Sequence, residues 1–236
     1  DIIWKKAEVI LGSRTSGCPA PLPDPDLVEK AAKILGESQQ PMIFVGGGAY
    51  EACQEIKTLA ETLQAPVISY QNGRGILDER HYLAHTNTAG AILWKNCDAA
   101  ISIGCRMQAE RMSWGMDDAL KIIHVDIDPT EINRIMKPDV GLVSDAAFTT
   151  RKIIDALNKY NLKRTSREEE MLNLKAQAEK LMEEKAGPQM AWLRAIRDVL
   201  PDNGLFVDEF TQVGYVSRVG FPVYNPRSMI TPGYQG

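Results

Sequence analysis

Two stretches decide the fold, ISIGCR at residues 101–106 and HVDIDPTEI at residues 124–132. Each begins as an apolar run typical of a buried strand and ends abruptly in glycine or charged residues. The polar stretch between them is long enough for one crossover connection, so we expect two neighbouring parallel strands. The carboxyl ends of such strands meet at one edge of a sheet, where ligands bind in open α/β folds. A ligand is therefore expected beside Gly104, Arg106 and Asp126.

The same alternation of strand and helix extends in both directions along the chain. Apolar runs predict strands at residues 41–45, 67–70, 99–104, 122–127 and 141–144. Helical patterns lie between them; one starts at Asp26, one near residue 109, and the last covers residues 146–160. Continuous apolar strands joined by helices are typical of a parallel sheet that is covered on both faces. We predict a doubly wound, Rossmann-like α/β domain over residues 26–160.

The flanking segments differ in composition from this domain. Residues 13–25 contain four prolines and predict an extended linker, and the short segment 1–12 is expected to be the end of a preceding domain. Residues 161–187 are rich in charge with a thin apolar stripe, which predicts a linker helix between domains. Residues 188–236 add a helix and a strand at 204–210, the expected start of a further α/β domain.

Composition excludes several classes of protein. The chain has 236 residues, of which 44% are hydrophobic, and a net charge of −4, so we expect no nucleic-acid partner. Its apolar runs are far shorter than the roughly 20 residues of a membrane helix, so we expect no membrane partner either. A cytoplasmic location is expected.

Three consecutive glycines, Gly46, Gly47 and Gly48, follow the first predicted strand and open the next helix. Backbone N–H groups at such a turn can face an anion, and phosphate is the natural ligand. A structural role is the alternative, since glycines at strand-to-helix turns also serve tight packing. The dinucleotide fingerprint is incomplete, because Glu51 stands where its third glycine would be.

Charged residues at the strand ends supply the other candidates. Arg106 could pair with a diphosphate or form a surface salt bridge. Asp126 and Asp128 alternate along a strand, so they point to opposite sides, and we expect one to bind ribose hydroxyls while the other caps the helix at Pro129. Asp145 could approach the same crevice or cap the helix that follows it. The sequence shows no catalytic triad and no Walker lysine, which indicates a binding region.

Taken in order, these motifs resemble the middle domain of thiamine diphosphate (thiamine pyrophosphate) enzymes of the acetolactate synthase-like family. The resemblance rests on residues 41–48, 73–75, 104–106, 124–132 and 143–146. It implies a DHS-like nucleotide-binding domain, preceded at residues 1–12 by the end of a pyrimidine-binding domain. Residues 200–212 resemble the opening of the diphosphate-binding domain, where Gln212 matches a glutamine that contacts the cofactor tail; Thr211 and Val213 replace the neighbouring glycine and histidine.

The resemblance also implies the cofactors. In the FAD-containing members the contacts match seven positions of this chain: Gly46, Gly47, Gly48, Gly104, Arg106, Asp126 and Asp145. The segment facing the flavin ring, usually Gly-Met-His-Gly, reads Asn-Thr-Ala-Gly at residues 87–90. This departure favours retention of nucleotide binding over flavin-ring binding, so FAD or ADP is expected, or a structural role alone.

The whole protein implied by this resemblance is a 2-keto acid decarboxylase or carboligase. It would use thiamine diphosphate and Mg²⁺, act on a 2-keto acid and form a homodimer or homotetramer. The present chain is expected to be an interior piece without activity of its own, because the catalytic glutamate and the metal motif of the family lie in other segments. The alternative is an adenine-nucleotide-binding module without catalysis.

Overall fold

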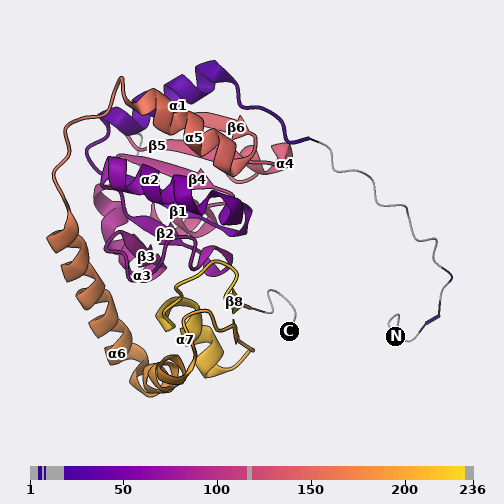
Figure 1. The fold of residues 1–236 in the computed structure, drawn as a ribbon, viewed down its shortest axis with the longest axis vertical. Helices are drawn as coiled ribbons and strands as arrows, with labels where there is room; N and C mark the ends of the chain where they lie inside the picture. Colours follow the sequence, from indigo (N-terminus) through magenta and orange to yellow (C-terminus); the bar gives the residue numbers. More distant parts are fainter. Residues whose placement is uncertain (1–4, 7, 9–18, 116–118, 232–236) are drawn as a thin grey trace.

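A computed structural model of the chain describes residues 5, 6, 8, 19–115 and 119–231. Within these residues six parallel strands form one sheet (Figure 1). The strands are β1 (Pro41–Val45), β2 (Val67–Ser69), β3 (Ala84–Thr86), β4 (Ala99–Ile103), β5 (Lys121–Asp126) and β6 (Val140–Val143). Their order is β3-β2-β1-β4-β5-β6, which confirms the predicted doubly wound α/β fold.

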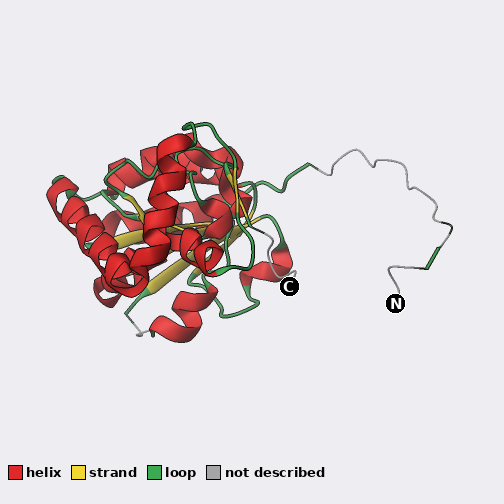
Figure 2. Cartoon of the chain, turned by 90° about the horizontal axis from the view of Figure 1, so that it is seen from below, coloured by secondary structure: helices red, strands yellow, loops and turns green. Residues whose placement is uncertain are grey.

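Alternate residues of each strand build two separate apolar layers. Ile43 and Val45 of β1 pack with α1 (Pro25–Glu37), α2 (Cys53–Leu63) and α5 (Ala146–Leu157) on one face of the sheet. Met42 and Phe44 point the other way, to a second cluster that contains Trp94. Figure 2 shows the strands enclosed by helices. Both faces are therefore buried, as the continuous apolar runs predict.

The order of strands places a topological switch between β1 and β4. From β1 the chain winds outward to β2 and β3, then returns to β4 on the other side of β1. Val45 is in register with Ile103, so the two strands end side by side. In open α/β sheets, ligands bind outside the carboxyl ends of the strands at such a switch point.

Several predicted boundaries need correction at the helices. Asp24, not Asp26, caps α1 by accepting the Asp26 N–H at 2.9 Å, with Pro25 as the first helical residue. The glycines open a six-residue 3₁₀-helix, η2 (Gly47–Ala52), before α2 begins. The predicted helix near residue 109 is a five-residue π-helix, η5 (Glu110–Trp114), and Gly115 at φ 89° turns the backbone out of it.

One strand of the sheet was not predicted from the sequence. β3 has only three residues, Ala-His-Thr, and lies at the sheet edge beside β2. It leads into α3 (Asn87–Leu93) and a 3₁₀ turn, η4 (Trp94–Asn96). Such a short, partly polar segment has no apolar run to mark it. β3 pairs with β2, which lies about 17 residues earlier in the chain, so the pairing leaves no pattern within the β3 segment itself.

The charged segment forms α6 (Glu168–Val199), which leads away from the sheet in Figure 1. It consists of two helices, because Ala186 has non-helical angles just before Pro188. After it come β7 (Phe206–Val207), α7 (Gln212–Gly220) and β8 (Met229–Ile230), with β7 and β8 paired in parallel. The strand predicted at 204–210 is thus only two residues long, and β8 was not predicted.

Residues 200–231 dock on the sheet domain through Arg74. This buried side chain donates to both carboxylate oxygens of Glu79 and to the backbone carbonyls of Arg218 (2.6 Å) and Phe221 (2.5 Å) at the end of α7. Glu79 also accepts the Val223 N–H at 3.0 Å. The turn after β2 and the end of α7 are therefore held by one network. Among the described helices, none combines the length and apolar character of a membrane span.

Candidate functional site

The glycine turn after β1 packs directly on the turn after β4. Gly46 donates its N–H to the Ile103 carbonyl at 3.3 Å, and Gly48 donates to the Gly104 carbonyl at 3.2 Å. A Cβ on Gly48 would lie 2.8 Å from the Gly104 Cα, and one on Gly46 would lie 2.5 Å from the Gly104 oxygen. Two of the three N–H groups expected to face phosphate are thus used in backbone bonds. These glycines permit the close approach of the two turns.

Gly47 differs from its two neighbours. A Cβ here would lie 3.3 Å from the Asn72 Cβ and 3.6 Å from the Tyr50 ring, so no backbone blocks it. As the first residue of η2, its N–H has no acceptor within the helix. Of the three glycines, Gly47 therefore keeps a backbone donor for a ligand.

A cavity of about 910 Å³ lies over these turns, within the range of roughly 300–1,000 Å³ that is usual for small-molecule sites. It is lined by the strand ends and by residues from the C-terminal segment. The lining residues are Gly46, Gly47, Gly48, Ser69, Tyr70, Gln71, Asn72, Asn87, Gly104, Cys105, Arg106, Met107, Gln108, Asp126, Asp128, Glu131, Phe210, Arg218, Val219 and Thr231. The structure thus brings together six of the eight predicted site residues.

Arg106 faces the cavity from the end of β4 and forms an ion pair there. Its Nε and one terminal nitrogen donate to the two carboxylate oxygens of Glu131 at 2.7 and 3.0 Å. Arg134 donates to the same carboxylate at 2.6 Å. The Arg106 hydrogen bond lowers the pKa of Glu131, which keeps it ionised at neutral pH. Both alternatives predicted for Arg106 remain compatible with this geometry, since the salt bridge lies inside the cavity wall.

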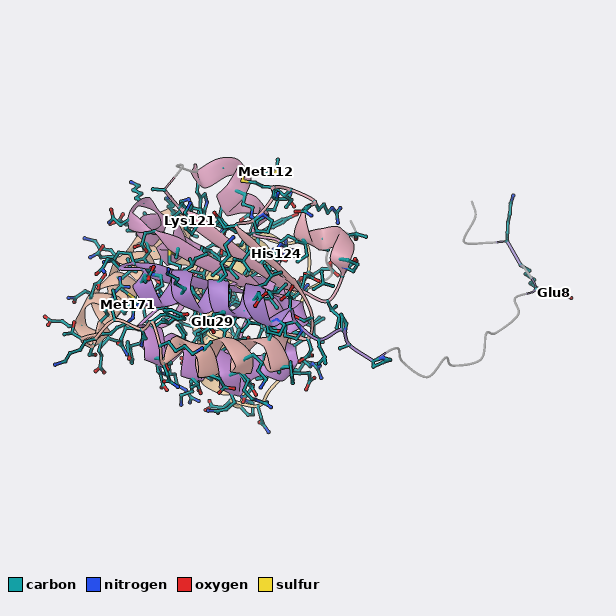
Figure 3. The ribbon with its side chains drawn as sticks, turned by 90° about the horizontal axis from the view of Figure 1, so that it is seen from above. Glu8, Glu29, Met112, Lys121, His124 and Met171 are labelled. Carbon is teal, nitrogen blue, oxygen red and sulfur yellow. The ribbon has the colours of Figure 1, made fainter. Side chains whose placement is uncertain are left out.

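Asp126 and Asp128 both line the cavity, which corrects the expectation that they point to opposite sides, and one of them caps a helix as predicted. Asp128 caps α4 (Pro129–Ile132) by accepting the Thr130 N–H at 2.8 Å, and hydrogen bonds from Thr130 lower its pKa. One carboxylate oxygen of Asp126 accepts the Asp128 N–H at 3.0 Å, and the other lies 3.9 Å from Nε2 of the buried His124 ring. Figure 3 shows His124 within the body of the domain. Asp126 therefore retains carboxylate lone pairs toward the cavity.

Two predicted residues lie outside the cavity lining. Asp145 caps α5 by accepting the Phe148 N–H at 2.8 Å, which is the structural alternative considered for it. Gln212 begins α7, and its side-chain oxygen accepts a hydrogen bond from Gln189 at 3.0 Å. Thr211, standing where the family has glycine, caps the same helix by accepting the Gly214 N–H. Both helix ends are thus explained by capping alone.

A buried polar pair lies beneath the cavity and was not anticipated. The Tyr70 hydroxyl, at the end of β2, donates to Glu110 of η5. Burial raises the pKa values of both groups, and Glu110 has no exposed surface. Glu110 lies six residues after Gly104 and is brought to Tyr70 by the π-helix, so no local sequence signal marks the pair.

The C-terminal segment contributes Phe210, Arg218, Val219 and Thr231 to the cavity lining. Arg218 of α7 donates to Asp208 at 3.3 Å and lies over the Phe210 and Tyr215 rings, 5.4 and 5.0 Å from their centres. Thr231 donates to Gln71 at 3.5 Å. The contact between Thr231 and Gln71 joins residues 160 positions apart, which sequence reasoning could not pair.

Comparison with known proteins defines the class. Residues 28–157, more than half of the chain, match the thiamine pyrophosphate enzyme central domain. The chain therefore belongs to the thiamine pyrophosphate enzyme family, as the sequence resemblance indicates.

Its curated relatives include acetolactate synthases. It is 35% identical over 147 residues to the probable acetolactate synthase large subunit of Methanocaldococcus jannaschii, covering 58% of this chain and 25% of the relative. It is 30% identical over 167 residues to the acetolactate synthase large subunit of Corynebacterium glutamicum, covering 66% and 26%. The chain thus spans about a quarter of the length of the curated relatives it matches.

Proposed function

We propose that this chain binds an adenine nucleotide, FAD or ADP, in the cavity at the carboxyl ends of β1, β4 and β5. The observation that carries the proposal is the meeting of Gly47 and Asp126 in one cavity of about 910 Å³ at the topological switch point. Doubly wound folds bind nucleotides at this position. The alternative of a purely structural turn accounts for Gly46, Gly48 and Gly104, but it assigns no role to the cavity.

The groups that line the cavity suit the parts of a nucleotide. Asp126 can accept hydrogen bonds from ribose hydroxyls, because a carboxylate offers more acceptor sites than its one backbone bond uses. Gly47 N–H and the Arg106 guanidinium can face the diphosphate. Asn87 adds a buried side-chain oxygen for which the described residues supply no hydrogen-bond donor. These features support binding of the nucleotide part of the ligand, and they do not distinguish FAD from ADP.

For the whole protein we propose a thiamine diphosphate-dependent 2-keto acid decarboxylase or carboligase, a homo-oligomer that uses Mg²⁺. The support is the family and the acetolactate synthase relatives. When bound, thiamine diphosphate would supply the carbanion-stabilising chemistry.

The described residues themselves do not fit that cofactor. They contain no cluster of three His, Cys, Asp or Glu suited to a metal, and Gln212 is paired with Gln189 outside the cavity. We therefore derive no catalytic step for this chain, and we expect a pure 236-residue preparation to release no CO2 from pyruvate with thiamine diphosphate and Mg²⁺. Measurable release would show that the residues needed for catalysis are present in it.

Calorimetric titration tests the nucleotide proposal. The chain is titrated separately with ADP and with FAD, and each titration is repeated with Arg106→Ala. We expect both nucleotides to bind with comparable affinity and Arg106→Ala to weaken binding by about 1.5–3 kcal/mol, the range for a hydrogen bond to a charged group. Absence of binding by either nucleotide would leave the glycines as structural. A strong preference for FAD would indicate a flavin-binding domain.

A further inference from the structure

Glu131 is the acidic residue of the cavity lining that pairs with Arg106. It is the third residue of α4, which begins where β5 ends, and it lines the same cavity as Gly47 and Arg106. Its carboxylate meets the guanidinium of Arg106 edge on, through two hydrogen bonds of 2.7 and 3.0 Å. The Glu131 side chain is only 10% exposed, whereas that of Arg106 is 50% exposed. The carboxylate is thus held in the wall, and the guanidinium lies toward the open space.

The same edge of a guanidinium recognises carboxylate and phosphate. Both anions present two oxygens at the spacing of the Nε and terminal N–H groups, so each can pair with them in a bidentate manner. An anion that enters the cavity near Arg106 also meets the negative charge of Glu131 itself. Asp126 and Asp128 add two further carboxylates to the lining. Glu131 is therefore expected to oppose phosphate binding both by occupying Arg106 and by repulsion.

We propose that Glu131 and the phosphate groups of a nucleotide compete for the Arg106 guanidinium, so that Glu131 limits the affinity of this cavity for nucleotides. This inference rests on the nucleotide site proposed above. Arg134 holds the Glu131 carboxylate from outside the cavity lining, at 2.6 Å. When phosphate takes Arg106, Glu131 keeps this second cationic partner. The exchange thus leaves no carboxylate without a partner.

The test is a titration of Glu131→Gln with ADP and with adenosine, which lacks phosphate. We expect ADP to bind about two- to fivefold more tightly than to the unaltered chain, the range that corresponds to a partly exposed ion pair. Adenosine should bind equally to both chains. In an Arg106→Ala background, Glu131→Gln should bring no gain in ADP affinity, because the guanidinium for which Glu131 and phosphate compete is absent.

Glu55→Gln is the matched control. Glu55 is similarly buried, with a 15% exposed side chain, and pairs with Arg151 on the helical face outside the cavity. The substitution changes the net charge of the chain by the same amount, so a gain that depends on charge alone would appear in it too. We expect its ADP affinity to equal that of the unaltered chain.

Three results would overturn the inference, and they are distinguishable. If the unaltered chain binds ADP and Glu131→Gln binds it equally or more weakly, Glu131 orients Arg106 instead of competing with the ligand. If adenosine or the Glu55→Gln control gains as much, the effect is unrelated to the Arg106 pair. If ADP binds neither the unaltered chain nor Glu131→Gln, the proposed nucleotide site is rejected, and the proposed competition is rejected together with it.

Discussion

Replacement of Gly104 by alanine is the sharpest test of how the two turns are built. Gly104 has φ 58°, a left-handed conformation that costs an L-residue about 1–2 kcal/mol. Its added Cβ would also lie 2.5 Å from both the Cα and the carbonyl carbon of Gly48. Backbone atoms cannot rotate away, so overpacking adds about 1–3 kcal/mol. We expect Gly104→Ala to lower the free energy of unfolding by about 2–5 kcal/mol.

Gly47→Ala is the control within the same turn. Its Cβ would lie 3.3 Å from the Asn72 Cβ, 3.6 Å from the Tyr50 ring and 3.8 Å from the Asn72 carbonyl oxygen, so we expect a change in the free energy of unfolding within about 1 kcal/mol. Gly47→Val should likewise leave a folded chain but abolish ADP binding, because a branched side chain would crowd the phosphates.

Urea denaturation, followed by circular dichroism, measures both variants against the unaltered chain. A loss of 2–5 kcal/mol would appear in thermal melting as a fall of about 4–20 °C for a chain of this size. Equal stability of Gly104→Ala and Gly47→Ala would mean that the two turns do not approach each other as closely as described.

Three further predictions concern other parts of the molecule. Arg74→Ala should lower the free energy of unfolding in urea by about 3–5 kcal/mol, because it leaves the largely buried Glu79 carboxylate without the guanidinium that pairs with it. A loss below about 1 kcal/mol would contradict the docking network. His85 is neutral in the fold, since burial lowers its pKa to about 3 from 6.5, so its contribution to stability falls as the pH drops from 6.5 toward 3. The loss amounts to about 2–3 kcal/mol at pH 4.5, and His85→Gln should flatten that part of the melting profile; an unchanged profile would contradict a neutral His85. Asp145→Asn keeps the cap of α5 and should leave ADP affinity unchanged, and a marked loss would place Asp145 in the site.

The sequence predicts most of the sheet because its central strands are continuous apolar runs. β1 matches its predicted bounds, and β4, β5 and β6 match within a residue at either end. An apolar run of four to six residues between polar segments has few other stable placements in a parallel sheet. β3 has no such run, and its strand character comes only from pairing with β2.

The site is less predictable because its contacts join distant segments. The sequence predicts that one of Asp126 and Asp128 caps α4, and Asp128 does so, but both residues line the cavity. The sequence cannot show that Gly48 packs against Gly104, since nothing local records the contact between the two turns. The same holds for Arg218, which reaches the cavity only through the docking of α7.

A crystal structure of the chain grown with ADP would show directly whether the cavity holds a nucleotide. We expect ADP in the cavity at the ends of β1 and β4, with its ribose on Asp126 and its phosphates between Gly47 and Arg106. ADP bound at another surface, or a cavity that holds no nucleotide at saturating ADP, would contradict the proposed nucleotide site.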